Sequence, residues 1–343
     1  MRKLLNTLFV TSEDKYLALE NNNVVVYCKE TKVAQYPLLS LESIVSFSYS
    51  GASPALMGAC AKSGISLVFM TPNGRFLART CGMEHGNVLV RRKQYRIADN
   101  ETESIKVARN FIAGKVFNQR WVLERATRDH AMRIDTNTIK KISSRLASRL
   151  SDIVTASSLD SLRGYEGDAS ADYFSVFNEL ILSQKVDFVF DGRNRRPPKD
   201  NVNATLSFVY TLLSNDCTSA LESVGLDAYV GFMHTDKSGR ASLALDLMEE
   251  LRAPIADRLV LTQINNRKIH DSDFDHKDDG SVYLNDEGRK KILQAWQTHK
   301  REEITHPYLH EKIPWGLVPY AQSLLLSRYI RNDIDGYPSF FWK

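Results

Sequence analysis

The first part of the chain has short apolar runs that are interrupted by turn-forming residues. The segments KLLNTLFV, KYLALE and VVVYCK are typical of short strands, and the asparagines at 21–23 predict a hairpin turn between the second and the third. One helix interrupts this pattern, with Ser53 as its N-cap, Pro54 in its first turn and Gly64 at its end. The strand-like segments ISLVFM and RFLART follow. This part is therefore predicted to be rich in β-structure.

From about Asn87 the apolar residues recur every three or four positions, which is typical of amphipathic helices. Asp200 is placed to cap one helix, and another is predicted to start near Ser242 and run through LALDLMEEL. The pattern predicts an α+β protein with two domains. Residues 1–86 would form a β-rich domain and residues 87–343 a larger all-α domain.

The charged segment from His270 to Asn285 contains three alternating aspartates, as a calcium-binding loop does. An EF-hand needs glycine at its sixth position and glutamate at its twelfth, where this chain has His276 and Val282. The pair Asp279-Gly280 instead predicts an exposed hairpin.

The composition is that of an ordinary folded protein, with 43% hydrophobic and 25% charged residues. No apolar segment approaches the roughly 20 residues that a membrane-spanning helix needs. The N-terminus has no signal-peptide pattern, and the four cysteines form no CxxC pair. We therefore expect a cytoplasmic protein with no membrane partner, no zinc site and no disulfides.

The net charge of +4 is unevenly distributed along the chain. Between Arg91 and Arg149 there are fifteen Lys or Arg residues against six Asp or Glu. Such an excess on helical sequence is consistent with a surface that contacts DNA phosphates, with Arg91 and Arg92 at its start. A solvated basic helix face is an equally good interpretation of the charge alone.

The helix predicted over LALDLMEEL carries carboxylates that could hold a metal ion. Asp246 is three residues from Glu249 and four from Glu250, so it shares a helix face with each of them. Carboxylates that share a face repel one another unless solvent, a base or a cation lies between them. Metal-dependent phosphoryl transfer uses such hard oxygen ligands, sometimes with one imidazole.

Two residues outside this helix could complete the set. His234 precedes it in a loop between Gly231 and Gly239, which could place an imidazole over the helix, although lone histidines are more often structural or exposed. Glu166 lies between two glycines at the expected start of a helix, where a carboxylate also interacts well with the helix dipole.

Several basic and aromatic residues near these positions are suited to DNA contacts, although charged surface loops and core tyrosines are common. The candidates are Tyr165, Arg193, Arg195, Arg196, Lys237 and Arg240.

The segments GYEGDASADYF, DNVNATLSFVYTLL and GLDAYVGFMHTDKSGRASLALDLMEELRAPIADRLV resemble, in order and spacing, the CRISPR-associated protein one family, the spacer-acquisition integrase. The segment IAGKVFNQR is similar to another motif of that family. The ending VPYAQSLLLSRYIRNDIDGYPSFFWK resembles the subtype I-C branch. The likeness extends over nearly the whole chain, with small departures at Ala228 and Met233.

The resemblance implies that Glu166, His234 and Glu249 are catalytic ligands of Mn²⁺ or Mg²⁺, with Asp246 as a neighbouring carboxylate. It implies an enzyme that joins the 3′-hydroxyl ends of a short DNA duplex, the prespacer, into the CRISPR array by transesterification. It also implies a homodimer that binds double-stranded DNA and CRISPR-associated protein two. Two alternatives stay open, which are a metal-dependent DNA endonuclease and a non-catalytic DNA-binding scaffold.

Overall fold

The computed structural model describes residues 6–72, 74–82 and 88–343. Its N-terminal region contains two sheets that share no strand. In the first, the order is β1-β5-β6-β7, where β7 is antiparallel to β6 and the other pairs are parallel. The second is the antiparallel sheet β2-β3-β4. The strand bounds are β1 Thr7–Val10, β2 Lys15–Glu20, β3 Asn23–Cys28, β4 Thr31–Pro37, β5 Ser43–Ser46, β6 Ser66–Met70 and β7 Phe76–Arg79.

Local sequence signals account for the turns and helix of this region. Asn21 and Asn22 have φ values of 47° and 59°, which asparagine tolerates better than most residues, and they join β2 to β3 in a tight turn. Helix α1 (Pro54–Ser63) connects the parallel strands β5 and β6. Ser53 caps it by accepting from the Leu56 N–H, and Gly64 ends it in the left-handed conformation. These predictions are confirmed.

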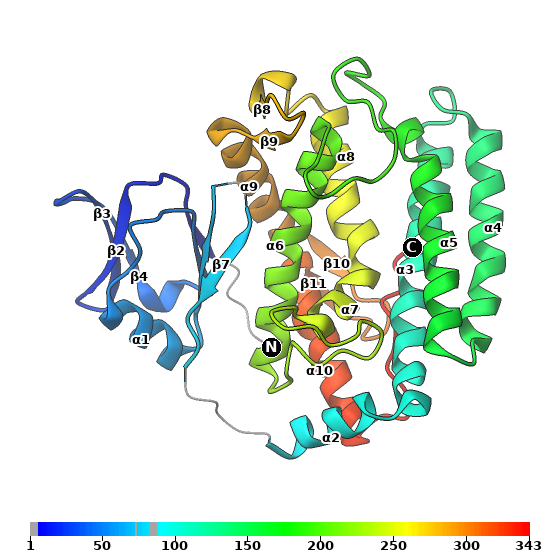
Figure 1. Cartoon of the computed structure of the whole chain (residues 1–343), viewed down its shortest axis with the longest axis horizontal. Coiled ribbons are helices and arrows are strands. Elements are labelled where there is room, and N and C mark those ends of the chain that lie inside the picture. Colours follow the sequence, from blue (N-terminus) through cyan, green and yellow to red (C-terminus); the bar gives the residue numbers. More distant parts are fainter. Residues whose placement is uncertain (1–5, 73, 83–87) are drawn as a thin grey trace.

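The C-terminal region is mainly helical, as predicted (Figure 1). Its α-helices are α2 Val88–Ala98, α3 Glu101–Asp129, α4 Thr136–Thr155, α5 Leu159–Ser175, α6 Asn201–Ser223, α7 Ser242–Leu251, α8 Arg258–Asn265, α9 Asp286–Arg301 and α10 Val318–Arg331. A π-helical segment at Arg252–Asp257 carries the chain from α7 into α8 across Pro254. The short 3₁₀ segments are Leu38–Ser40, Phe177–Leu180, Asp271–Asp273 and Trp315–Leu317.

Two small hairpins interrupt the helices of this region. Strands β8 (Phe274–His276) and β9 (Val282–Leu284) form the hairpin predicted around Asp279-Gly280, and Gly280 supplies the positive φ of 76° that the turn needs. Strands β10 (Glu303–Thr305) and β11 (Lys312–Pro314) form the second. The α+β class is confirmed, with a β-rich N-terminal region followed by a larger helical one.

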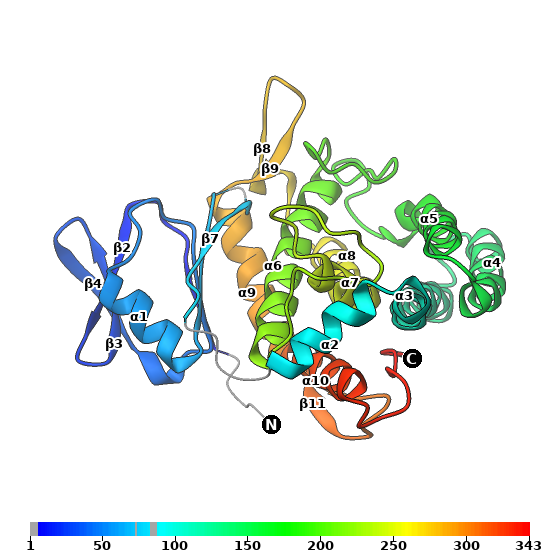
Figure 2. The same cartoon turned by 60° about the horizontal axis from the view of Figure 1, so that its bottom comes forward.

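The sheet β1-β5-β6-β7 lies between the outer sheet and the helices, as both views show (Figures 1 and 2). Ile44 and Leu67 on one face belong to a small core with α1 and the second sheet. Phe47, just after β5, belongs to the large core of the helical region. Its ring stacks on that of Phe208 of α6, with 6.0 Å between the ring centres. The predicted boundary between residues 86 and 87 falls at 83–87, outside the described residues, so the division into two domains stays a prediction.

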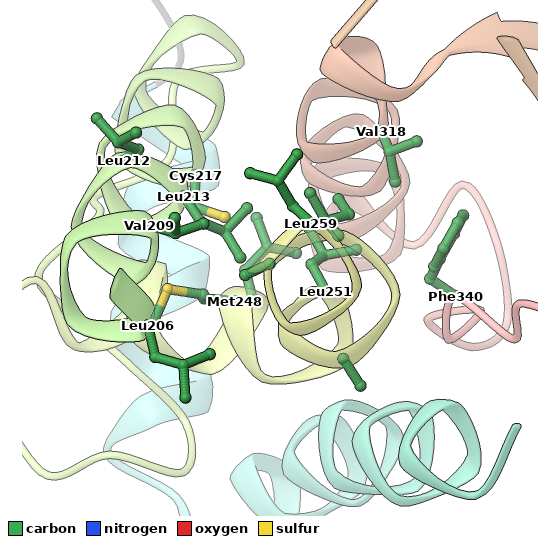
Figure 3. Close-up of a cluster of buried hydrophobic side chains, with 14 of the residues drawn as sticks. Leu206, Val209, Leu212, Leu213, Cys217, Met248, Leu251, Leu259, Val318 and Phe340 are labelled. Atoms are coloured by element: carbon green, nitrogen blue, oxygen red, sulfur yellow. The ribbon is translucent and has the colours of Figure 1, made fainter. Parts of the chain in front are cut away.

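Helix α7 is the most enclosed element of the helical region. It packs against α3, α6 and α10. Met248 lies next to the α6 residues Leu206 and Val209, and Leu251 belongs to the same apolar cluster (Figure 3). This burial fixes α7 in place, together with the carboxylates that it carries. No helix in the described part of the chain is long and apolar enough to cross a bilayer.

Candidate metal centre

Glu166 lies in the middle of α5, not at the start of a helix as the sequence suggested. The N-cap is Ser158, which accepts from the Ser161 N–H, so Glu166 follows it by about two turns. A favourable dipole at the helix N-terminus therefore does not explain this carboxylate. Gly164 and Gly167 lie on either side, and a Cβ added at either would meet no atom within 4 Å. The glycines thus leave open space beside Glu166.

His234 lies in the loop between α6 and α7 and is held there by Asp246 of α7. The fully buried Asp246 carboxylate accepts hydrogen bonds from the backbone N–H groups of Phe232, Met233 and His234 at 2.6–2.9 Å. Its Oδ1 also lies 2.6 Å from Nδ1 of the His234 ring. Asp246 therefore fixes both the loop and the ring, and Nε2 of His234 lies 4.0 Å from Glu249 Oε1.

Glycine is required at position 231 for this arrangement. A Cβ at Gly231 would lie 2.9 Å from Asp246 Oδ2, from the His234 carbonyl oxygen and from Ser242 Cβ. Two of these three atoms cannot move without displacing the loop or the buried carboxylate. Gly231 and Phe232, which come shortly before His234, thus help to hold the imidazole in place.

The ammonium group of Lys115 joins the two carboxylates of the candidate site. Lys115 is a buried residue of α3, and its Nζ contacts Glu166 and lies 2.7 Å from Glu249 Oε2. Arg252 approaches Glu249 from the other side, with Nη2 3.0 Å from Oε1. Burial raises the pKa of Glu249, but Arg252, Lys115 and His234 together outweigh it and hold that pKa at about 2. Glu249 is therefore ionised in its buried position.

Glu166, His234, Asp246 and Glu249 thus come from three segments and lie near one another, linked by Lys115 and by the His234 ring. No three His, Cys, Asp or Glu side chains of the described residues are grouped closely enough to hold one metal ion as they stand. The glutamates do not close around a metal position because the ammonium group of Lys115 contacts both of them. Glu249 Oε2 is nevertheless buried without a well-aligned hydrogen bond. The carboxylates are arranged around a positive charge and retain capacity to accept from a further partner.

The surroundings of Glu250 differ completely from those of its neighbour Glu249. Its buried carboxylate accepts from the Tyr337 hydroxyl, from Gln322 Nε2 at 2.9 Å and from the Phe340 N–H at 2.7 Å. Burial raises the pKa of Glu250 to about 7, against the lowering effect of these hydrogen bonds. Glu250 attaches the C-terminal segment to α7 and does not face Lys115.

The residues predicted to contact DNA lie in different surroundings. Arg193 is half-buried and donates to Asn203 Oδ1 at 2.6 Å and to Ser207 Oγ at 3.1 Å, so its guanidinium already has partners. Arg195 and Arg196 are exposed on the same loop. Arg240 donates to the Thr235 carbonyl within the His234 loop, where Lys237 is exposed.

The other predicted contacts lie on α5 and α2. Tyr165 is half-buried against the main core, and Arg149 lies 5.8 Å from the centre of its ring. Arg91 and Arg92 lie on α2. Within the basic stretch 91–149 several cations are paired with nearby carboxylates, such as Lys140 with Glu124 and Arg145 with Asp172. The charge excess is therefore not one continuous free surface.

Sequence reasoning missed Lys115 and Arg252 as members of the site. Lys115 had been counted only as part of the basic stretch. A signal was present, because Lys115 is the one cation in the apolar run IAGKVF at a position where the helix is buried. A buried lysine needs carboxylate partners, and these come from α5 and α7.

Comparison with known proteins shows the family to which the chain belongs. A family model described as CRISPR associated protein Cas1 matches residues 8–298. The chain is 46% identical over 343 residues to a CRISPR-associated endonuclease Cas1 of Chlorobaculum tepidum, and the match covers 100% of both chains.

Two solved structures share the fold. A casposase bound to integration product has a TM-score of 0.83 at 20% identity, over 98% of this chain and 94% of that one. A chain of a Cas6-RT-Cas1–Cas2 complex has a TM-score of 0.82 at 22% identity, over 100% of this chain and 36% of that one. Because a matching family model spans most of the sequence and a relative is 46% identical along its whole length, the chain belongs to the Cas1 family of CRISPR-associated proteins.

Proposed function

We propose that this Cas1-family enzyme is a metal-dependent DNA integrase of CRISPR adaptation. It would join the 3′-hydroxyl ends of a short duplex, the prespacer, into the CRISPR array in the cytoplasm. Family membership and a relative named as an endonuclease support chemistry on phosphodiester bonds. The shared fold of a casposase bound to its integration product is compatible with strand joining. The C-terminal segment leads us to propose subtype I-C as the finer assignment.

The observation that carries this proposal is the contact of Lys115 with both Glu166 and Glu249 beside the fixed ring of His234. A surface that only binds DNA would gain nothing from two glutamates here, since they repel phosphate unless a cation lies between them. The side chains of Glu166 and His234 are 26% and 29% exposed, so substrate can reach them. The site therefore favours an enzyme over a non-catalytic scaffold.

Glu166, His234 and Glu249 would hold one Mn²⁺ or Mg²⁺ ion. The donor types fit, since hard carboxylates suit both metals and an imidazole favours Mn²⁺. Glu249 Oε2 is buried and lies 2.7 Å from Lys115 Nζ, so it already has a cationic partner that a metal ion would replace. The Asp246 carboxylate accepts a hydrogen bond from Nδ1–H of His234. The lone pair of Nε2 is therefore available to coordinate a metal ion. The ion, when bound, would polarise the attacked phosphate and lower the pKa of the incoming hydroxyl.

The protein's own residues would supply orientation and charge. Asp246 holds the imidazole, and Lys115 offsets part of the charge of both carboxylates until another cation takes that place. Arg252 keeps Glu249 ionised. In the transesterification the 3′-oxygen forms a bond to phosphorus while the bond to the array's own 3′-oxygen breaks. The number of phosphodiester bonds is unchanged, so no external energy source is required.

The rival enzyme is a metal-dependent endonuclease, which would use the same residues with water in place of the 3′-hydroxyl. A branched or nicked DNA substrate with a labelled 3′-hydroxyl strand separates the two. Strand transfer yields a joined labelled product, whereas hydrolysis yields only shorter strands. Cleavage without any joined product under all divalent metals tested would replace integration with the endonuclease.

We also propose a homodimer formed through the N-terminal region, with CRISPR-associated protein two as a further partner. The edge strand β4 is mostly exposed, and Val33, Tyr36 and Leu39 are 50%, 40% and 76% exposed around it. Exposed apolar residues at an unpaired edge favour association with another chain. A related fold occurs in a complex named Cas6-RT-Cas1–Cas2, which agrees with the second partner.

The dimer is expected to dissociate when the β4 edge is charged. Val33→Glu combined with Tyr36→Lys should shift sedimentation at micromolar concentration from dimer to monomer. Met132→Glu is the control, because Met132 is 98% exposed and lies between α3 and α4, on the opposite side of the molecule from β4 (Figure 1). A wild-type monomer, with no partner recovered on co-expression, would contradict both assignments.

Binding of duplex DNA is expected to weaken steeply with salt. Each neutralised phosphate contributes a slope of about −0.9 in log affinity against log salt. Arg92 and Arg96 are exposed on α2, so Arg92→Gln with Arg96→Gln should reduce the slope by roughly one to two units without changing sequence preference. The double change Lys290→Gln with Glu287→Gln on α9 removes an existing ion pair and is the control. An unaltered slope would mean that α2 is only a solvated basic face.

A further inference from the structure

The two glutamates of the candidate metal centre are placed relative to each other by α3. Glu166 lies on α5 and Glu249 on α7. Helix α3 packs against both of these helices, whereas α5 and α7 have little direct contact with one another. The separation of the two carboxylates, which Lys115 of α3 bridges, therefore depends on how closely α3 approaches α7.

Gly114 of α3, which directly precedes Lys115, permits this close approach. A Cβ added at Gly114 would lie 2.8 Å from Glu250 Cβ on α7, closer than Cβ atoms come to other atoms in real structures. It would also lie 3.4 Å from Ser339 Cβ, which belongs to the C-terminal segment 339–342. Helix α3, helix α7 and the C-terminal segment are therefore in close contact at this glycine.

Asn118 of α3 joins the same three parts of the fold by hydrogen bonds. Its side chain is completely buried. Nδ2 donates to the carbonyl oxygens of Glu250 and Phe340, both at 2.7 Å, and Oδ1 accepts from the Trp342 N–H at 2.9 Å. Both N–H groups of the amide and its oxygen are thus used. Every one of these partners is a backbone group, so Asn118 fixes the course of the chain itself.

A proline explains why the end of α7 needs a donor from another helix. In an α-helix the Glu250 carbonyl would accept from the N–H of the residue four positions on, which is Pro254 and has no N–H. The chain becomes π-helical there, at Arg252–Asp257. Asn118 supplies the donor from α3, so the same hydrogen bond also fixes the end of α7 against α3. The residue next to Glu250 is the candidate ligand Glu249.

We propose that Asn118 is a positioning residue for the candidate metal centre, and that it holds the end of α7 at the distance from α3 at which Glu166 and Glu249 can bind one ion. This inference rests on the proposed metal-dependent function. Asn118 acts through the backbone of α7 and through the C-terminal segment. It also gives a role to the segment IAGKVFNQR, in which Lys115 contacts both glutamates and Asn118 sets their separation.

The test measures Mn²⁺ binding to the protein without DNA, from the electron paramagnetic resonance signal of free Mn²⁺. Gly114→Ala removes no hydrogen bond and favours the helix, but it places a Cβ against Glu250 and forces α3 away from α7. It should lower the affinity for Mn²⁺ by about 10–100-fold, the range for losing a group that orients metal ligands. Asn118→Ala should lower the affinity to a similar extent, because the end of α7 loses its attachment to α3.

Asn201→Ala is the matched control. Asn201 is also a buried asparagine whose Nδ2 joins distant segments, donating to the Asp187 carbonyl at 2.9 Å and to Asp271 Oδ1 at 2.8 Å. Neither of these segments carries a candidate metal ligand. Asn201→Ala should therefore lower the thermal stability and leave the affinity for Mn²⁺ unchanged.

A strand-joining assay over a range of Mn²⁺ concentrations runs in parallel. In Gly114→Ala and Asn118→Ala, kcat should fall at low Mn²⁺ and recover at high Mn²⁺, while KM for DNA changes by less than about twofold. A purely structural role would lower thermal stability without shifting the Mn²⁺ dependence. Wild-type affinity for Mn²⁺ in Gly114→Ala would overturn the inference even if Asn118→Ala fails to fold. Absence of Mn²⁺ binding by the wild type would instead remove the proposed metal-dependent function, and the inference with it.

Discussion

Replacing Glu166 or His234 with alanine is expected to abolish strand joining while the fold and DNA binding remain nearly intact. Both side chains are partly exposed, and neither belongs to the apolar core, so little packing is lost. The loss of rate should be at least about 10²–10³-fold, the scale for removing one preorganised group from a reacting centre. The labelled 3′-hydroxyl assay measures the rate, and thermal unfolding together with DNA affinity verifies that the protein is otherwise unchanged.

The carboxylates of α7 are expected to differ in their effects on joining. Glu249→Gln should act like Glu166→Ala, because it removes a charge from the centre. Asp246→Asn should be milder, about 10–100-fold, because Asp246 supports the imidazole from behind and an amide oxygen retains part of that support. The opposite order would show that the ligand carboxylate had been wrongly chosen. Undiminished joining in Glu166→Ala or His234→Ala would remove the metal model.

Lys115→Met is expected to destabilise the protein by about 3 kcal/mol in the presence of a chelator. The change leaves Glu249 buried with only Arg252 as a close cation and takes from Glu166 its partner on α3. Removing one partner of a buried ion pair costs about 3–5 kcal/mol, because the charge of the other partner stays buried without compensation. Denaturant unfolding measures this loss.

Divalent metal should restore much of that stability. An ion that binds the folded state stabilises it by mass action, and in Lys115→Met it does not compete with the ammonium group. The stabilisation by Mn²⁺ should therefore be larger in Lys115→Met than in the wild type. Lys140→Met is the control, since its pair with Glu124 is solvent-exposed on the lysine side and contributes about 1 kcal/mol or less. Equal stabilisation of Lys115→Met and of the wild type by Mn²⁺ would contradict the view that Lys115 occupies the cation position.

Local signals in the sequence were enough to predict many elements of the fold. Ser53 and Gly64 bound α1, and Asp200 caps α6 by accepting from the Asn203 N–H. The asparagine turn after β2 and the Asp279-Gly280 hairpin also form as predicted. These features depend on a few neighbouring residues, through side-chain caps and tolerated φ values, and therefore do not require tertiary contacts. The helix through Glu166 was misplaced because its true cap, Ser158, lies two turns upstream.

The resemblance to family motifs also led to the prediction that Glu166, His234 and Glu249 belong to one site. It did not determine what each of them contacts. Asp246 and Glu249 share a helix face, but only the packing of the His234 loop on α7 makes Asp246 a support for the ring. Lys115 belonged to a basic stretch in the sequence, and only the approach of α3 to α5 and α7 brings its ammonium group to the two glutamates.

Glu249 and Glu250 show most directly what the tertiary structure decided. Adjacent residues on an α-helix point about 100° apart, and on a helix enclosed by α3, α6 and α10 each direction leads to a different neighbour. Glu249 meets Lys115 and Arg252, which hold its pKa at about 2, whereas Glu250 meets Tyr337, Gln322 and the backbone of Phe340, and burial raises its pKa to about 7. The two side chains are chemically identical in the sequence. Their charge and role follow from the polarity of what packs against each face, which no local pattern contains.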